Sequence, residues 1–121
     1  FMKIFFPGEN PAQFAGKKIS PKMLLVAPGM RLSWQYHHRR AELWRIYEGN
    51  VFVMMSDTDD ETEPKKFVPG DLVRLKQGER HRLIGAEGWG IVAEIWQHTD
   101  PQNPSDENDI VRVQDDFGRG R

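Results

Sequence analysis

The feature that most limits how this chain can fold is the spacing of its apolar residues, which fall into short, separate runs. No window of about a dozen residues has the three-and-four spacing of an amphipathic helix. Pro-Gly, Gln-Gly and similar turn residues separate the runs. The pattern predicts an all-β sandwich or barrel with little helix. The predicted strands are Met23–Ala27, Leu43–Tyr47, Val51–Met55, Leu72–Leu75, Arg82–Ile84, Gly90–Trp96 and Ile110–Val113.

The segments between these runs are predicted to have little regular structure. One or two helical turns are expected near Pro11–Ala15. The polar and acidic stretch Asp57–Lys66 is typical of a solvated hairpin loop, and this interpretation is preferred over a calcium site. His98–Asn108, which contains two prolines and two asparagines, is expected to be an extended connection before the last strand.

Length and charge narrow the possible functions. A chain of 121 residues fits one domain, with a core expected at about 20–98 and a C-terminal segment at 109–119 that packs on it. Seventeen basic and 18 acidic residues lack the basic excess that nucleic-acid binding requires. No apolar run is long enough to predict a membrane span or a signal peptide, so a cytoplasmic protein is expected.

Four side chains could meet around one divalent metal ion. Because the chain has no cysteine, any metal must be bound through nitrogen and oxygen. Gln35 and His37 are two residues apart, so on an extended strand they lie on the same face. Glu42 follows after a short turn, and His81 comes from a separate strand candidate after Gly78. One amide, two imidazoles and one carboxylate suit Zn, Mn, Fe, Co or Ni equally well.

The spacing of these donors resembles the two sequence motifs of the cupin superfamily. The first segment reads G-x5-Q-x-H-x4-E-x6-G from Gly29 to Gly49, with glutamine in place of the first histidine of the motif. The second reads G-x5-K-x-G-x2-H-x3-G from Gly70 to Gly85, with lysine for proline and glycine for asparagine. The resemblance implies a single-domain cupin, a double-stranded β-helix or jelly-roll barrel.

A narrower resemblance concerns the type II mannose-6-phosphate isomerases. Gln35–Trp44 reads QYHHRRAELW and resembles their signature Q-x-H-H-H-R-A-E-H-W. Gly78–Leu83 resembles G-x-W-H-R-L, and Asp109–Arg119 resembles D-D-I-V-R-x-x-D-x-Y-G-R. The family interconverts mannose 6-phosphate and fructose 6-phosphate, often behind a guanylyltransferase domain. The resemblance therefore implies the stand-alone isomerase half, acting on a phosphosugar.

By motif position, the resemblance makes Gln35, His37, Glu42 and His81 the metal ligands and Arg40 the arginine associated with isomerase activity. The sequence departs from the signature at Arg39 and Leu43, where the family has histidine.

The chemistry of aldose–ketose isomerisation suggests further residues. The reaction needs a base near the carbon and an electrophile on the oxygens, and a divalent ion supplies the latter. Glu42, which is predicted to share a strand face with Trp44 and Ile46, could move protons, and so could Glu94 or His38. The candidate catalytic residues are Arg40 and Glu42. The candidate substrate contacts are Arg40, His38, Trp44, Lys76 and Glu94.

Two other functions remain open at this point. The replaced histidines at Arg39 and Leu43 are also compatible with a non-catalytic sugar-binding or regulatory cupin. An oxygen-using iron cupin is a third possibility, because histidine and carboxylate also bind non-haem iron. A homodimer is predicted, in which an extended Lys3–Phe6 segment crosses to the partner and covers a strand edge. Neither a nucleic acid nor a membrane is expected as a partner.

Overall fold

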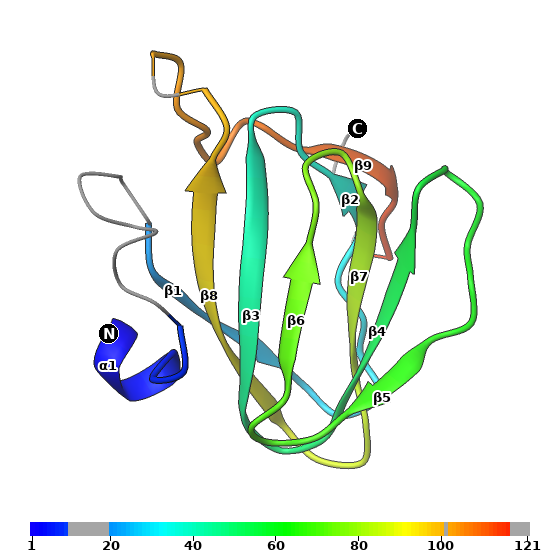
Figure 1. Cartoon of the computed structure of the whole chain (residues 1–121). Coiled ribbons are helices and arrows are strands. Elements are labelled where there is room, and N and C mark those ends of the chain that lie inside the picture. Colours follow the sequence, from blue (N-terminus) through cyan, green and yellow to red (C-terminus); the bar gives the residue numbers. More distant parts are fainter. Residues whose placement is uncertain (10–19, 101, 117–121) are drawn as a thin grey trace.

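Figure 1 shows the computed structural model of the chain, which describes residues 1–9, 20–100 and 102–116. One short helix and nine strands are assigned within these ranges. They are α1 (Met2–Phe5), β1 (Lys22–Val26), β2 (Trp34–Tyr36), β3 (Arg40–Glu48), β4 (Val51–Ser56), β5 (Lys65–Phe67), β6 (Leu72–Leu75), β7 (Arg80–Gly85), β8 (Gly90–His98) and β9 (Val111–Gln114).

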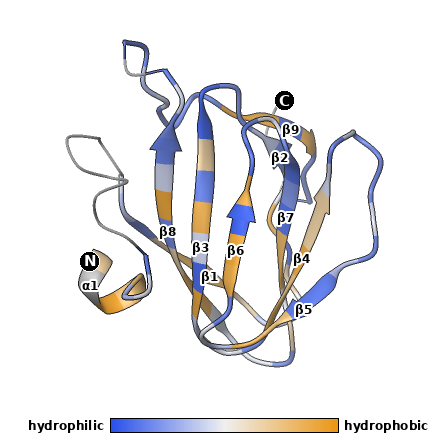
Figure 2. Ribbon diagram, in the orientation of Figure 1, coloured by the Kyte–Doolittle hydropathy of each residue, from blue (hydrophilic) through white to orange (hydrophobic). Residues whose placement is uncertain are grey.

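The strands form two antiparallel sheets that face each other. The first sheet has the order β1-β8-β3-β6, and the second has the order β5-β4-β7-β2-β9. Side chains from both sheets fill the space between them, which makes a continuous apolar core. Its buried members are Val26, Trp44, Ile46, Val51, Val53, Val73, Leu75, Leu83 and Val92. Figure 2 shows that the upper ends of β3 and β7 are hydrophilic, whereas apolar residues predominate lower in the sheets.

Strand β3 has buried residues on both of its faces. Glu42, Trp44 and Ile46 are all buried and alternate along the strand, as the sequence predicted. Leu43 lies on the opposite face and packs in a second apolar cluster with Phe6 of the N-terminal segment. The short helix α1 therefore packs against part of the outer face of the first sheet (Figure 1).

The predicted strands agree with the structure to within a few residues, but two strands were not predicted. Strand β2 is only three residues long, so it ends before His37. The predicted loop Asp57–Lys66 is two residues too long at its C-terminal end, because Lys65 and Lys66 belong to β5 and pair with β4. This edge strand is mostly exposed and two of its three residues are lysines, so the sequence has no apolar run that would predict it.

The N-terminal segment differs from its prediction. Lys3–Phe6 was expected to be extended, but Met2–Phe5 form a helical turn and Phe6 is buried against the chain's own first sheet. The reason is that Phe6 finds an apolar site beside Leu43 within the same chain. The homodimer itself stays a prediction. The expected helical turns near Pro11–Ala15 lie outside the described residues.

The C-terminal segment adds the edge strand β9 to the second sheet, where it pairs with β2. Residues 117–119 of the predicted 109–119 segment lie outside the described residues. Within the part of the connection that is described, residues 99–100 and 102–110 contain neither helix nor strand. No helix in the described ranges has the length and apolar composition needed to cross a bilayer.

Two glycine turns provide a test of the backbone geometry. Gly49, between β3 and β4, has φ +73°, and an added Cβ would overlap the carbonyl oxygen of Trp89. Gly29 has φ +68° with open space around the same position. We expect Gly29→Ala to lower the free energy of unfolding by about 1–2 kcal/mol, the cost of a left-handed conformation. Gly49→Ala should cost about 3 kcal/mol or more, because the overlap adds to that cost.

Chemical denaturation of both variants measures this difference. Equal losses of stability in the two variants would contradict the close approach of Gly49 to Trp89.

Candidate metal centre

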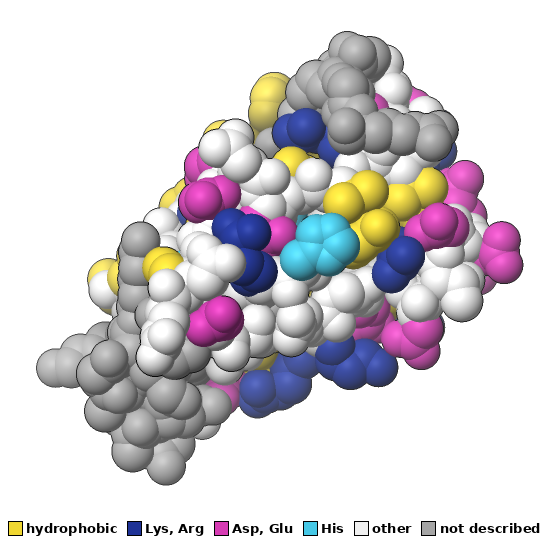
Figure 3. All heavy atoms as spheres, turned by 90° about the horizontal axis from the view of Figure 1, so that it is seen from above, with side chains coloured by type: hydrophobic (Ala, Val, Ile, Leu, Met, Phe, Trp, Pro, Cys, Tyr) yellow, Lys and Arg dark blue, Asp and Glu magenta, His cyan; other side chains and the backbone are white. Residues whose placement is uncertain are grey.

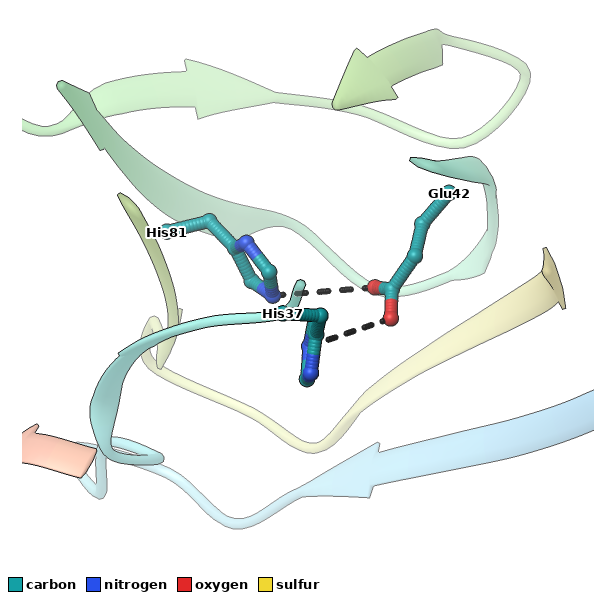
Figure 4. A group of neighbouring side chains, drawn as sticks. All are labelled: His37, Glu42 and His81. Carbon is teal, nitrogen blue, oxygen red and sulfur yellow. Dashed lines mark ion pairs between the residues drawn. The ribbon is translucent and has the colours of Figure 1, made fainter. Parts of the chain in front are cut away.

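Three side chains that could hold a metal ion, which we call the metal-binding group, converge at the end of the barrel where the β2–β3 and β6–β7 turns lie. His37 follows β2, Glu42 is in β3 and His81 is in β7 (Figure 4). Their potential ligand atoms all lie within 4.8 Å of one another. The Nε2 atom of His37 is 3.2 Å from one Glu42 oxygen, and Nε2 of His81 is 3.6 Å from the other. All three side chains are buried. The predicted meeting of these residues from three strand regions therefore occurs.

Hydrogen bonds to the other ring nitrogen fix the orientation of both imidazoles. Nδ1 of His37 lies 2.6 Å from the carbonyl oxygen of Asp109, and Nδ1 of His81 lies 3.1 Å from that of Glu79. A carbonyl oxygen can only accept, so each Nδ1 carries the proton and donates it. Each Nε2 then has its lone pair directed into the site. This is the arrangement in which histidine binds a metal ion.

Burial keeps the two imidazoles neutral. It lowers the pKa of His37 to about 3, with further contributions from nearby His81 and Arg40. Burial likewise lowers the pKa of His81 to about 4. Both rings are therefore neutral at ordinary pH, with their lone pairs available to a cation.

Gln35 lies directly beside the two histidines. It pairs with His81 across β2 and β7, and its side-chain nitrogen is 3.4 Å from Nε2 of both His37 and His81. Its side-chain oxygen accepts a hydrogen bond from Ser33. Because a hydroxyl group can also accept, turning the amide by 180° keeps the bond to Ser33 and directs the oxygen to the histidines. Gln35 could thus provide a fourth ligand atom.

The donors fit a divalent transition metal. Bonds of about 2.0–2.2 Å from nitrogen and carboxylate oxygen to one ion place neighbouring ligand atoms a little over 3 Å apart. The distances of 3.2 and 3.6 Å from the imidazoles to Glu42 match this requirement. The group can therefore hold a metal ion, and its mixed nitrogen and oxygen donors are compatible with Zn, Mn, Fe, Co and Ni alike.

Arg40 reaches into the same group of ligand atoms. Its Nε donates to Glu42 over 2.7 Å, and one terminal nitrogen donates to Nε2 of His37 over 3.2 Å. The guanidinium also stacks on Trp96, with its carbon 3.5 Å from the ring centre. A metal ion bound by Nε2 of His37 would use the lone pair that now accepts from Arg40. One donor of Arg40, which lines the cavity, would then no longer be engaged by His37.

Asp109 holds the loop that carries His37. Its carboxylate accepts from the backbone nitrogens of His38 and Arg39 over 2.8 and 2.9 Å, and from the Ser105 hydroxyl over 2.6 Å. Burial alone would raise the pKa of Asp109, but these hydrogen bonds outweigh it and lower the pKa to about 2. The same residue also provides the carbonyl oxygen that orients His37.

Glu94 is a second buried carboxyl group next to Glu42. Its oxygens accept from the indole nitrogens of Trp44 and Trp96, each over 2.8 Å. Burial raises the pKa of Glu94 above its ordinary value, and the neighbouring charge of Glu42 raises it further. The two tryptophans therefore fix the orientation of this carboxyl group.

A cavity of about 180 Å³ opens beside the metal-binding group. Five of the predicted site residues line it, namely Gln35, Arg40, Trp44, His81 and Glu94. His38 and Lys76 do not: His38 is exposed with its ring against Tyr36, and Lys76 is exposed and pairs with Asp57. His38 lies in the turn between β2 and β3, outside either strand. Figure 3 looks onto this end of the barrel, where basic and acidic side chains are interspersed.

Sequence reasoning missed several residues of the site. Asp109 was part of the resemblance to the isomerase family, but no role was given to it. Lys22 and Arg112 line the cavity from β1 and β9, and only the strand register, which the sequence does not reveal, brings them there. Trp96 was predicted to lie in a strand, and its alternation with Glu94 was the available signal.

Comparisons with known proteins agree with this architecture. No family model matches the chain. It is 30% identical over 105 residues to mannose-1-phosphate guanylyltransferase ManC of Salmonella typhimurium, covering 87% of this chain and 20% of that protein. It is also 30% identical over 106 residues to xanthan biosynthesis protein XanB of Xanthomonas campestris, covering 86% and 21% respectively. The chain thus spans about a fifth of the length of these curated relatives.

A solved structure has a similar fold. A cupin 2 conserved barrel domain protein from Salinispora arenicola matches with a TM-score of 0.53 and 23% identity, over 63% of this chain and 60% of that chain. Together with the two facing antiparallel sheets, this match confirms the prediction of a cupin β-barrel.

Removing one imidazole provides a test of metal binding. We expect the protein to bind about one Co²⁺ or Zn²⁺ per chain, and His81→Ala to weaken that binding by at least about a hundredfold. Even residues that only support a ligand contribute about ten- to a hundredfold. Calorimetric titration measures the affinities, and circular dichroism checks the fold. The exposed His38→Ala is the matched control, and an equal loss in both variants would exclude this site.

Replacing Asp109 provides a separate test of the loop that carries His37. Asp109→Ala removes three hydrogen bonds to a carboxylate, so we expect the free energy of unfolding to fall by about 3 kcal/mol. Metal affinity should also fall by about ten- to a hundredfold, because the loop no longer orients His37. Denaturant unfolding and metal titration measure the two effects. The exposed Asp60→Ala should change stability by less than about 0.5 kcal/mol.

Proposed function

We propose that this chain is a metal-dependent aldose–ketose isomerase that interconverts mannose 6-phosphate and fructose 6-phosphate through an enediol. The observation that carries the proposal is the convergence of two imidazole Nε2 atoms and one carboxylate within 4.8 Å, next to a polar cavity. Gln35, His37, Glu42 and His81 would hold the metal ion.

The two curated relatives support a sugar-phosphate substrate. One is named as a mannose-1-phosphate guanylyltransferase and the other as a xanthan biosynthesis protein. The similarity covers most of this chain but only about a fifth of each relative. The isomerase reaction itself rests on the site and on the sequence signature at Gln35–Trp44.

The bound metal ion would polarise the carbonyl and hydroxyl oxygens of the sugar and stabilise the negative charge of the enediolate. Glu94 is our candidate for the base that moves the proton between C2 and C1. Its carboxyl group lines the cavity, while Glu42 is used as a ligand. The indole groups of Trp44 and Trp96 hold Glu94 in place, so its free lone pairs keep a fixed direction.

Arg40 would bind an oxygen of the substrate. It lines the cavity, and its terminal nitrogens carry donors beyond the one that Glu42 engages. Ser105 and the backbone oxygen of Asp106 accept from one of these nitrogens over 3.2 Å, which holds the guanidinium in place. Stacking on Trp96 restricts the guanidinium plane further.

The departures from the isomerase signature lie away from the cavity. Leu43 faces the outer side of the first sheet, where it is buried beside Phe6. A residue at this position therefore cannot reach the metal-binding group. Arg39 is partly exposed and lies 3.5 Å from Asp106. These positions give no structural reason against isomerase activity.

A non-catalytic sugar-binding cupin is the second candidate function. It shares the fold and the cavity but does not require a base at Glu94. Turnover of a phosphosugar therefore separates the two functions.

We expect the protein with a divalent metal to convert mannose 6-phosphate to fructose 6-phosphate. Glu94→Gln should lower kcat by about 10²–10⁴-fold, because a positioned base contributes about that much. Its metal affinity should stay within about threefold of the wild type, since Glu94 is not proposed as a ligand. A coupled assay for fructose 6-phosphate measures the rate.

Glu87→Gln serves as the matched control, because Glu87 is exposed outside the cavity. Full activity of Glu94→Gln would exclude Glu94 as the base. The absence of turnover in the metal-loaded wild type, with mannose 6-phosphate and related phosphosugars, would favour the binding function.

A further inference from the structure

We propose that Arg112 and Lys22 form an anion-binding subsite in the cavity, which takes the phosphate group of a phosphorylated sugar. The inference rests on the proposed function for the identity of the sugar, but the subsite itself is argued from the cavity. Neither residue was among the predicted substrate contacts.

Strand register directs Arg112 into the cavity. Arg112 pairs with Gln35 across β9 and β2, and directly paired residues of antiparallel strands have their side chains on the same face. Gln35 faces the metal-binding group, so Arg112 faces the same interior, and both residues line the cavity. The guanidinium therefore extends from the edge strand toward the space beside the metal centre.

The same reasoning places Lys22 on the opposite wall. Lys22 pairs with Glu94 across β1 and β8, so its side chain shares the inward face with Glu94. Both of these residues line the cavity. Two cations thus come from opposite sheets, each as the strand partner of a site residue.

Arg112 is the cavity cation that lacks a partner within the described residues. Its Nε is buried and donates no hydrogen bond. Arg40, in contrast, is engaged by Glu42, and Arg82 donates to Leu32, Glu61 and Gln114. A buried donor without an acceptor costs free energy, and this cost is relieved when an anion binds.

Lys22 is available to a ligand at small cost. It pairs with Glu107 at 2.9 Å, but the side chains of Lys22 and Glu107 are 41% and 73% exposed. Exposed ion pairs of this kind contribute little stability, so an anion in the cavity can compete with Glu107 for the ammonium group. Glu107 also lines the cavity, at its solvent-exposed side.

The chemistry of the pair selects a phosphate group. A guanidinium presents a planar fork that matches phosphate oxygens, and an ammonium adds a second positive charge. Two cations suit a dianion better than a single carboxylate. Since Gln35 and His81 line the same cavity of about 180 Å³, a small ligand can contact the subsite and the metal centre together.

Calorimetric titration of the full chain with mannose 6-phosphate and with unphosphorylated mannose tests the subsite. We expect the wild type to bind mannose 6-phosphate at least about tenfold more tightly than mannose. Arg112→Gln and Lys22→Gln should each weaken the binding of mannose 6-phosphate by about tenfold or more, and leave the binding of mannose unchanged. Inorganic phosphate should compete with mannose 6-phosphate in the wild type.

Arg74→Gln is the matched control, because Arg74 is an exposed residue of β6 that pairs with Glu9. It should bind both sugars as the wild type does. If Arg112→Gln does not fold, Lys22→Gln decides, because it changes only a partly exposed side chain. Arg112→Lys should lose less affinity than Arg112→Gln, since it keeps the charge without the fork.

The outcomes separate the subsite from the isomerase function. The subsite is overturned if the wild type does not prefer the phosphorylated sugar, or if the Arg112 and Lys22 variants bind it as the wild type does. If the protein turns over mannose 6-phosphate but the Arg112 and Lys22 variants bind it as the wild type does, the isomerase function is supported and the subsite is excluded. If both variants lose the preference for the phosphorylated sugar and the wild type shows no turnover, the subsite is supported and the isomerase function is contradicted.

Discussion

The pairing of the three-residue strand β2 with β7 on one side and β9 on the other is the constraint on which the whole site depends. It sets Gln35 opposite His81 in one pair and opposite Arg112 in the other. His37 follows directly after β2, so its position depends on the same pairing. A shift of this strand by one residue would turn Gln35 to the other face and take a donor away from both the metal centre and the cavity.

Around this strand, several buried polar groups form hydrogen bonds with one another. Asp109 accepts from two backbone nitrogens and Ser105, while Arg40 connects Glu42, His37 and the connection after β8. A buried polar group that loses its hydrogen-bond partner destabilises the folded state, so removing one member of this network also destabilises the members that it contacts. The site is therefore rigid because of its connections, although several of its members lie on loops.

The sequence predicts the barrel from its short apolar runs, and the metal-binding group from local spacing together with the resemblance to the two cupin motifs, the second of which contains His81. The alternation of Glu42, Trp44 and Ile46 and the two-residue step from Gln35 to His37 are visible without a structure. The sequence does not show which strands are neighbours, so the roles of Asp109 and Arg112 could not be predicted. His38 and Lys76 were predicted to contact the substrate, but both lie in turns between strands, are exposed and do not line the cavity.

The location of the two ends of the described chain has a practical consequence for work with this protein. The N-terminal helix α1 and Phe6 pack on the outer face of the first sheet, on the far side of that sheet from the inward-facing Glu42 and Glu94. Strand β9, in contrast, carries Arg112 and comes only a few residues before the C-terminus. A fusion partner joined before Phe1 is thus separated from the cavity by a layer of protein, whereas Asp116, the last described residue at the other end, lies only two positions after the strand that carries Arg112.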